Sequence, residues 1–254
     1  GSFLMGHDSG AAHYKYDEEV PQAYEQISDI TATVTQNKVG DFMDNNHITY
    51  TTPTFDIGGA SVSLDLGYAF DANDTETSDG GVAHKKHATY GTGQEAGLTI
   101  SYDALKLGVY GAERENTTPS AAGADANRDE FNGVWYVKYA FGPVSVGYSQ
   151  AFRAELLANN AYQTGTNVDY YDQTNYSIAF AASDDLSVSY ERETSEKNFV
   201  GSGQAAVEQE SSAVQVAYTM GGMTIALSHA SHDNNSYTTD ANVDQTLLAV
   251  TMAF

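Results

Sequence analysis

The sequence contains no cysteine. Without thiols it can form neither a disulfide framework nor a thiolate metal site. Basic residues are also scarce, because 11 Lys and Arg stand against 34 Asp and Glu, for a formal net charge of -23. Nucleic acid is therefore not an expected partner, since phosphate contacts need lysine and arginine. An acidic chain of this kind suits a surface or a pore that attracts cations.

Long apolar runs are missing as well. Mean hydropathy is -0.40, and no apolar run approaches the roughly 18 residues that a membrane-spanning helix requires. A helical membrane protein is excluded. A transmembrane barrel is not, because its strands are only about ten residues long and are apolar at every second position. The sequence also lacks an initiator Met and a signal peptide, so we expect a mature or truncated form.

The last segment, residues 243–254, shows the alternation of a strand with one apolar side. That side carries Thr246, Leu248, Val250, Met252 and Phe254. A final strand that ends on an aromatic carboxyl terminus resembles the closing strand of bacterial outer-membrane β-barrels. The resemblance implies that Phe254 is part of the signal read by the barrel-assembly machinery.

The same alternation recurs along the whole chain. We predict about twelve antiparallel strands, with enrichment in Tyr, Val, Thr and Phe that agrees with strand propensity. They cover residues 1–7, 46–54, 61–70, 95–102, 104–110, 131–141, 144–152, 171–182, 186–193, 211–220, 223–232 and 243–254. Tight turns such as Gly142-Pro143 and Gly221-Gly222 alternate with long polar connections. Short and long links therefore lie at opposite ends of the strands, as in a barrel with brief periplasmic turns and extended external loops.

The two faces of these strands differ. One face, which includes Leu64 and Val146, is apolar and uncharged at its middle positions. A Lys or Arg facing lipid at the bilayer midplane costs roughly 2–4 kcal/mol. The opposite face, which includes Ser63 and Ser145, is small and polar and has few of the long charged side chains of a soluble sheet. The pattern favours a lipid-facing exterior and a water-filled interior.

One region carries a more specific resemblance. The run Met5-Gly6-x-x-x-Gly10-Ala11, a long acidic stretch, and then Asn46-x-Ile48-x-Tyr50-x-x-Pro53-x-Phe55 resemble the fifth strand, third loop and sixth strand of general diffusion porins. The likeness is to the alphaproteobacterial, Rhodobacter-like group. It implies a single barrel domain over residues 1–254, an inward-folded constriction loop over residues 8–45, a homotrimer, and a bacterial outer-membrane location in contact with lipid. Sixteen strands are usual in that family, so it also implies about four strands before Gly1, on the order of 70–90 residues.

The resemblance also assigns the constriction. Asp17, Glu18, Glu19, Glu25 and Asp29 would supply its negative side, and Lys106 and Lys138, which have interior parity, would supply the basic side. We therefore expect a water-filled channel for ions and small hydrophilic solutes, mildly cation-selective and without enzymatic activity.

Other interpretations stay open. An outer-membrane enzyme would draw on His229 and His232 near Ser228 and Ser231, although no Gly-x-Ser-x-Gly motif occurs. A complete twelve-strand barrel and a soluble β-sandwich or adhesin are further alternatives. No cofactor is expected. Carboxylates in residues 71–79, 113–129 and 169–172 are ligands that Ca²⁺ accepts, but none forms a spaced calcium-loop motif, so solvated loops are favoured.

Overall fold

The computed structural model describes residues 1–6, 11–17, 19–27, 30, 43, 46–72, 90–117, 128–157, 167–201 and 203–252. These residues form one sheet of thirteen strands. The strands are β1 (Ser2–Gly6), β2 (His47–Thr51), β3 (Phe55–Ile57), β4 (Ala60–Ala69), β5 (Tyr90–Tyr102), β6 (Leu105–Asn116), β7 (Glu130–Phe141), β8 (Val144–Ala154), β9 (Val168–Ala181), β10 (Leu186–Phe199), β11 (Val207–Met220), β12 (Met223–Asp233) and β13 (Val243–Met252). Short 3-10 helices occur at η1 (Ala12–Lys15) and η4 (Asn235–Tyr237). Within the described ranges, no helix is long and apolar enough to cross a membrane.

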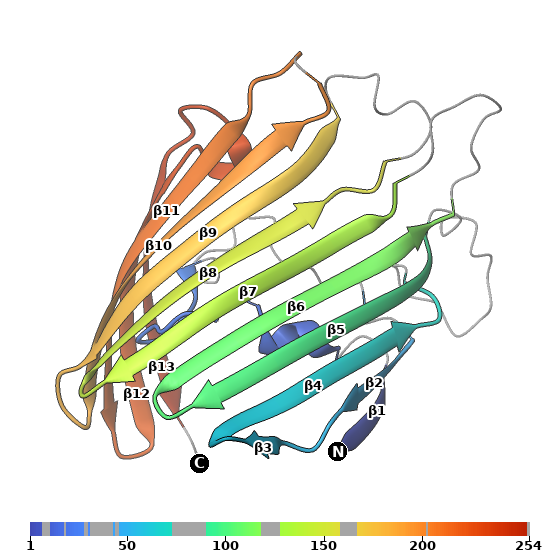
Figure 1. Ribbon diagram of the computed structural model, residues 1–254. Helices are drawn as coiled ribbons and strands as arrows, with labels where there is room; N and C mark the ends of the chain where they lie inside the picture. The colour runs from blue at the N-terminus through green and yellow to red at the C-terminus, as the bar shows by residue number, and fades with distance from the viewer. Residues whose placement is uncertain are drawn as a thin grey trace.

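The sheet is antiparallel and follows the order of the chain. Its path runs β1-β2-β4-β5-β6-β7-β8-β9-β10-β11-β12-β13, and the short β3 pairs with β4 beside this path. The sheet curves strongly, so that it has a convex outer face and a concave inner face (Figure 1). β1 and β13 are its two outermost strands, and the sheet is not closed. The expectation of an all-β antiparallel fold is confirmed, and β3 is the strand that the alternation did not predict.

Side chains on the outer face are apolar and exposed. Leu64 is 40% exposed, Val250 is 54% exposed, and Val146 is half-buried. No second sheet covers them among the described strands, which all belong to a single sheet. Exposed apolar surface of this extent is unusual for a soluble monomer. It marks a surface that contacts a membrane or another protein. This arrangement disfavours the soluble sandwich.

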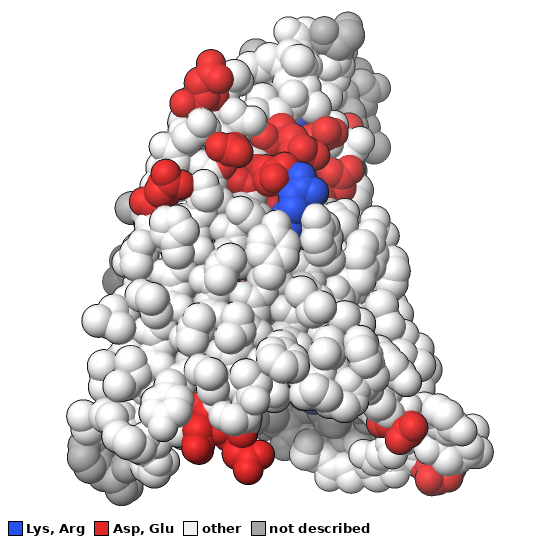
Figure 2. All heavy atoms as spheres, turned by 90° about the vertical axis from the view of Figure 1, so that its left-hand side faces the viewer, with Lys and Arg blue, Asp and Glu red and all other residues white. Residues whose placement is uncertain are grey.

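Charge is confined to the margins of that outer face. On the side that includes β10 and β11, acidic side chains gather near the upper and lower margins, with a wide uncharged band between them (Figure 2). The pair Arg192–Glu210 lies toward the end with the long connections, and Asp184 and Asp185 lie in a short turn at the opposite end. An uncharged band between polar margins is the surface expected of strands that cross a bilayer.

The tight turns lie where the sequence predicts them. Gly142 (φ 58°) and Gly221 (φ 61°) adopt the left-handed backbone that two-residue hairpin turns require. At the other end the strands are longer than predicted, since β6 continues to Asn116 and β10 to Phe199. The reason is that pairing of backbone amides continues past the apolar band, where outward positions carry charge, as Glu113 does.

Candidate functional site

A stretch of chain that we call the inner segment, residues 11–17 and 19–27, lies on the concave side of the sheet (Figure 1). It begins with η1 against β4 and β5 and reaches β10 and β11 through backbone hydrogen bonds to inward side chains. Most of its contacts join residues far apart in sequence, so that the chain crosses the inner wall rather than following one strand. The inner segment is the candidate functional site.

Tyr16 is the centre of the first attachment. Its side chain is fully buried, its hydroxyl donates a hydrogen bond to Asp65 Oδ2 at 2.8 Å, and it accepts one from Thr99 Oγ1 at 3.3 Å. The ring stacks on Tyr110 with centroids 5.2 Å apart. A Cβ on Gly97 would lie 2.4 Å from the Tyr16 ring, so the wall is hollowed to receive it. Burial, and then the hydrogen bond and the negative charge of Asp65, raise the pKa of the Tyr16 hydroxyl, which therefore stays a donor.

Wall carboxylates complete this attachment. Glu95 accepts the backbone N–H of Ala12 at 3.0 Å and the hydroxyl of Tyr110 at 2.8 Å. Lys15 forms an ion pair with Asp65 and donates to Thr51 Oγ1 at 2.9 Å. Both carboxylates are buried, and a buried carboxylate without partners would be strongly unfavourable. The first turn of the inner segment supplies the missing partners, so the segment and the wall stabilise each other.

Glu19 lies in the middle of the inner segment and meets the two predicted lysines. Its carboxylate contacts Lys138 directly and lies 3.5 Å from Lys106 Nζ. Two ammonium groups share one carboxylate, so this group as a whole has a net positive charge. The structure therefore brings together one predicted acidic residue and both predicted basic residues, in contact rather than across an open gap.

The second attachment extends from β8 to β12. Beyond Val20, Pro21 lies against Gly147, where a Cβ would come within 2.3 Å of Pro21 Cδ. The backbone N–H groups of Tyr24 and Glu25 donate to Gln215 Oε1 at 3.0 and 3.1 Å.

Further along, the N–H of Ile27 donates to Glu191 Oε2 at 3.2 Å, and its side chain packs with Ala213 and Ala230. Inward side chains of the sheet thus accept hydrogen bonds from backbone N–H groups of the inner segment, which belongs to no strand.

The remaining predicted residues are placed as follows. Asp17 and Glu25 are half-buried members of the inner segment. Glu18, Asp29 and Phe254 lie outside the described residues, so their predicted roles in the constriction and in assembly stay predictions.

Sequence reasoning missed a charged cluster nearer the long connections. Arg114 donates to Glu130 Oε2 from Nε at 2.9 Å and from Nη2 at 2.6 Å, and its guanidinium lies 3.6 Å from the centroid of the Tyr90 ring. Arg153 contributes a second contact to Glu130, at 3.0 Å. The signal was present, because Arg114, Glu130 and Arg153 have interior parity, but the residues lie beyond the apolar stretches used to define the strands.

The histidine and serine cluster does not form an accessible catalytic pair. His232 Nδ1 lies 2.8 Å from Ser211 Oγ, and both side chains are fully buried. His229 pairs instead with Thr246 on the outer face. In the described part of the chain, no group of three or more His, Cys, Asp or Glu side chains could hold a metal ion.

Comparisons with known proteins give the fold a context. No family model matches the sequence, and no curated protein matches it. Among solved structures, the outer-membrane expressed OmpT of Vibrio cholerae is 11% identical with a TM-score of 0.59, over 98% of this chain and 73% of that one. The outer membrane channel DcaP of Acinetobacter baumannii is 11% identical with a TM-score of 0.58, over 98% and 70%.

A loop L8 deletion mutant of the Vibrio OmpT is 13% identical with a TM-score of 0.57, over 98% and 74%. At such identities the comparison concerns architecture. The chain has the fold of outer-membrane β-barrel proteins.

Proposed function

We propose that the chain forms the wall of a bacterial outer-membrane porin, a channel through which water, ions and small hydrophilic solutes diffuse. The observation that carries the proposal is the pairing of an exposed apolar outer face with a polar segment attached across the inner face. The likeness to a protein described as an outer membrane channel supports it. In lipid, β1 and β13 need partners, because unpaired strand edges leave polar backbone groups without hydrogen bonds. The expectation of further strands before Gly1 stays a prediction.

The inner segment would narrow this channel, as the constriction loop of the proposal. Asp17, Glu18, Glu25 and Asp29 would give it an excess of negative charge, while Glu19 holds Lys106 and Lys138. We propose mild cation selectivity, in line with the net charge of -23. A homotrimer in lipid, assembled through recognition of the last strand and Phe254, belongs to the same proposal. The buried Ser211–His232 contact does not favour a hydrolase, since a substrate cannot reach a fully buried hydroxyl.

Recording from planar lipid bilayers tests the proposal. We expect discrete, steady conductance steps and a reversal potential in a KCl gradient that indicates a modest preference for K⁺. A protein that binds bilayers but conducts no ions, or one that strongly prefers Cl⁻, would contradict it.

The Glu19 cluster should set part of this selectivity. Glu19→Gln removes the carboxylate that two lysines share, so we expect the reversal potential to move toward Cl⁻. Replacing Lys106 and Lys138 by glutamine should move it the opposite way. Asp184→Asn, in a short turn outside the channel, is the matched control and should leave the reversal potential unchanged. Equal reversal potentials for all these variants would show that the cluster does not face the ion path.

The outer face gives a separate test of the membrane location. Val214 is 53% exposed, and an arginine at an exposed position of a soluble sheet would cost almost nothing. If the position faces lipid, Val214→Arg should lower the free energy of unfolding in bilayers by more than the about 0–1 kcal/mol expected of Asp233→Arg at the polar margin, and by up to the roughly 2–4 kcal/mol of the bilayer midplane. Urea titration of the protein in lipid vesicles measures both, and equal small losses would argue against lipid contact at Val214.

A further inference from the structure

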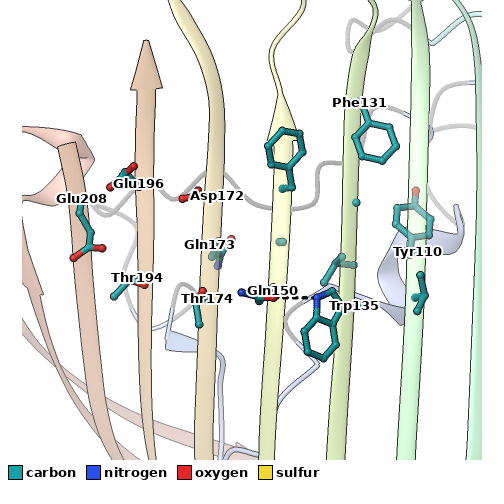
Figure 3. A pocket seen from close by; sticks show the side chains of 15 residues that line it. Tyr110, Phe131, Trp135, Gln150, Asp172, Gln173, Thr174, Thr194, Glu196 and Glu208 are labelled. Atoms are coloured by element: carbon teal, nitrogen blue, oxygen red, sulfur yellow. Dashed lines mark hydrogen bonds between the residues drawn. The ribbon is translucent and has the colours of Figure 1, made fainter. Parts of the chain in front are cut away.

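A groove of about 570 Å³ opens on the outer face of the sheet, across β6 to β11 (Figure 3). Its lining includes the rings of Phe131, Trp135 and Phe152, with Gly133 between them. A second hollow of about 520 Å³, lined by Leu66, Ala96 and Gly111 among others, lies on the other side of Phe131. Phe131 lines both, so the two hollows adjoin on the outer wall.

Two glycines let the ring of Phe131 pack against the sheet. Gly133 and Gly111 occupy outward positions opposite one another on β7 and β6. A Cβ on Gly133 would lie 3.1 Å from the ring of Phe131, closer than side chains ordinarily approach. Trp135 is held at the groove by a hydrogen bond from Nε1 to Gln150 Oε1 at 3.2 Å and by contact with Tyr148 at 5.5 Å between ring centroids. The result is an apolar groove with aromatic walls.

The side of the groove formed by β9, β10 and β11 is acidic. Asp172, Glu196 and Glu208 line it. They lie directly opposite one another on three neighbouring strands, Asp172 beside Glu196 and Glu196 beside Glu208. Like charges placed directly opposite in a sheet destabilise it.

Within the described ranges no lysine or arginine pairs with these three carboxylates, and the nearby Arg192 is already paired with Glu210. They therefore favour a positively charged ligand.

We infer that this groove binds a bilayer phospholipid whose headgroup carries a primary ammonium. One acyl chain lies along the groove against Phe131, Trp135 and Phe152, and the ammonium meets Asp172, Glu196 and Glu208. The inference rests on the proposed outer-membrane function, because only a membrane supplies this ligand. An ammonium rather than a metal ion is the favoured charge, since the described carboxylates do not form a metal-ligand group.

The chain offers a built-in probe, because Trp135 is its sole tryptophan. The protein is reconstituted in vesicles of unbrominated phosphatidylglycerol to which brominated phosphatidylethanolamine or brominated phosphatidylglycerol is added at equal mole fraction. Bromine quenches indole fluorescence on contact. We expect severalfold stronger relative association of phosphatidylethanolamine at Trp135.

In the variant Glu196→Gln/Glu208→Gln, which keeps side-chain shape, this preference should disappear. The matched control Asp184→Asn/Asp185→Asn, at the opposite margin, should keep it. Gly133→Leu forces the Phe131 ring out into the groove and should weaken quenching by both brominated lipids.

The outcomes separate the inference from the proposed function. Absence of quenching by either brominated lipid would contradict the membrane location itself. Equal quenching by both lipids, or a preference that survives the glutamine substitutions, would overturn the groove assignment alone. Phosphatidylglycerol quenching that overtakes phosphatidylethanolamine when Ca²⁺ is added would also overturn it, in favour of a metal-bridged anionic lipid.

Discussion

Replacing Tyr16 by alanine is expected to detach the first turn of the inner segment and raise the single-channel conductance. The substitution removes a fully buried ring that fits against Gly97 and stacks on Tyr110. Loss of a large buried aromatic typically costs about 3–5 kcal/mol. Here the cost should come mostly from docking of the segment, because the strand ladders do not depend on Tyr16 and the channel wall should persist. Conductance and current noise in planar bilayers are the measurements.

Tyr14 is the matched control for this experiment. It belongs to the same short helix, η1, but its side chain is 57% exposed. Tyr14→Ala should leave the conductance close to that of the parent protein. Tyr16→Phe should give an intermediate result, since it keeps the ring and removes the hydroxyl's hydrogen bonds with Asp65 and Thr99. A buried acceptor that loses its donor typically costs about 1–3 kcal/mol. If Tyr16→Ala conducts like Tyr14→Ala, the inner segment does not narrow the path.

The second large effect is expected at Glu130. This buried carboxylate pairs with Arg114, which is itself only 2% exposed. Glu130→Ala leaves that guanidinium and the neighbouring Arg153 without their shared carboxylate. Removing one partner of a buried ion pair typically costs about 3–5 kcal/mol. Equilibrium urea unfolding in lipid vesicles measures the loss, and the double variant Glu130→Ala/Arg114→Met should recover part of it because the buried positive charge is removed as well.

An exposed pair in the same sheet provides the comparison. Arg192 and Glu210 form hydrogen bonds much as Arg114 and Glu130 do, but their side chains are 34% and 37% exposed. Water solvates the remaining partner there, so Glu210→Ala should cost only about 0–1 kcal/mol. Similar losses for Glu130→Ala and Glu210→Ala would mean that the interior at Glu130 is as well hydrated as the outer margin.

The fold could be read from the sequence because membrane strands follow a simple local rule. Alternation of apolar and polar side chains specifies both strand and face, so Leu64 and Ser63 could be assigned to opposite sides without knowledge of the rest of the chain. Turn chemistry fixed the hairpins, as at Gly142 and Gly221. Strand ends near the long connections were predicted too short, because the rule depends on apolar outward residues and loses its signal where Glu113 and Glu196 take their place.

The site could be predicted only in part, because its contacts are not local. Interior parity identified Lys106 and Lys138, and the structure places both at Glu19. Nothing in the local pattern could show that Tyr16 would find Asp65, or that Gln215 would pair with the backbone of Tyr24. The small, polar inward face was predicted to line a water-filled interior. At Gly97 and Gly147 the inner segment lies against that face.

The span of the inner segment has a consequence for biogenesis. Gln215 is 191 residues away from Tyr24, its hydrogen-bonding partner, and contacts between such distant residues form late because a long loop must first be closed. A ribosome or a translocase delivers Tyr24 well before β11 exists. The inner segment therefore cannot dock fully until nearly all of the chain has been delivered. It should be the last part of the protein to reach its native structure.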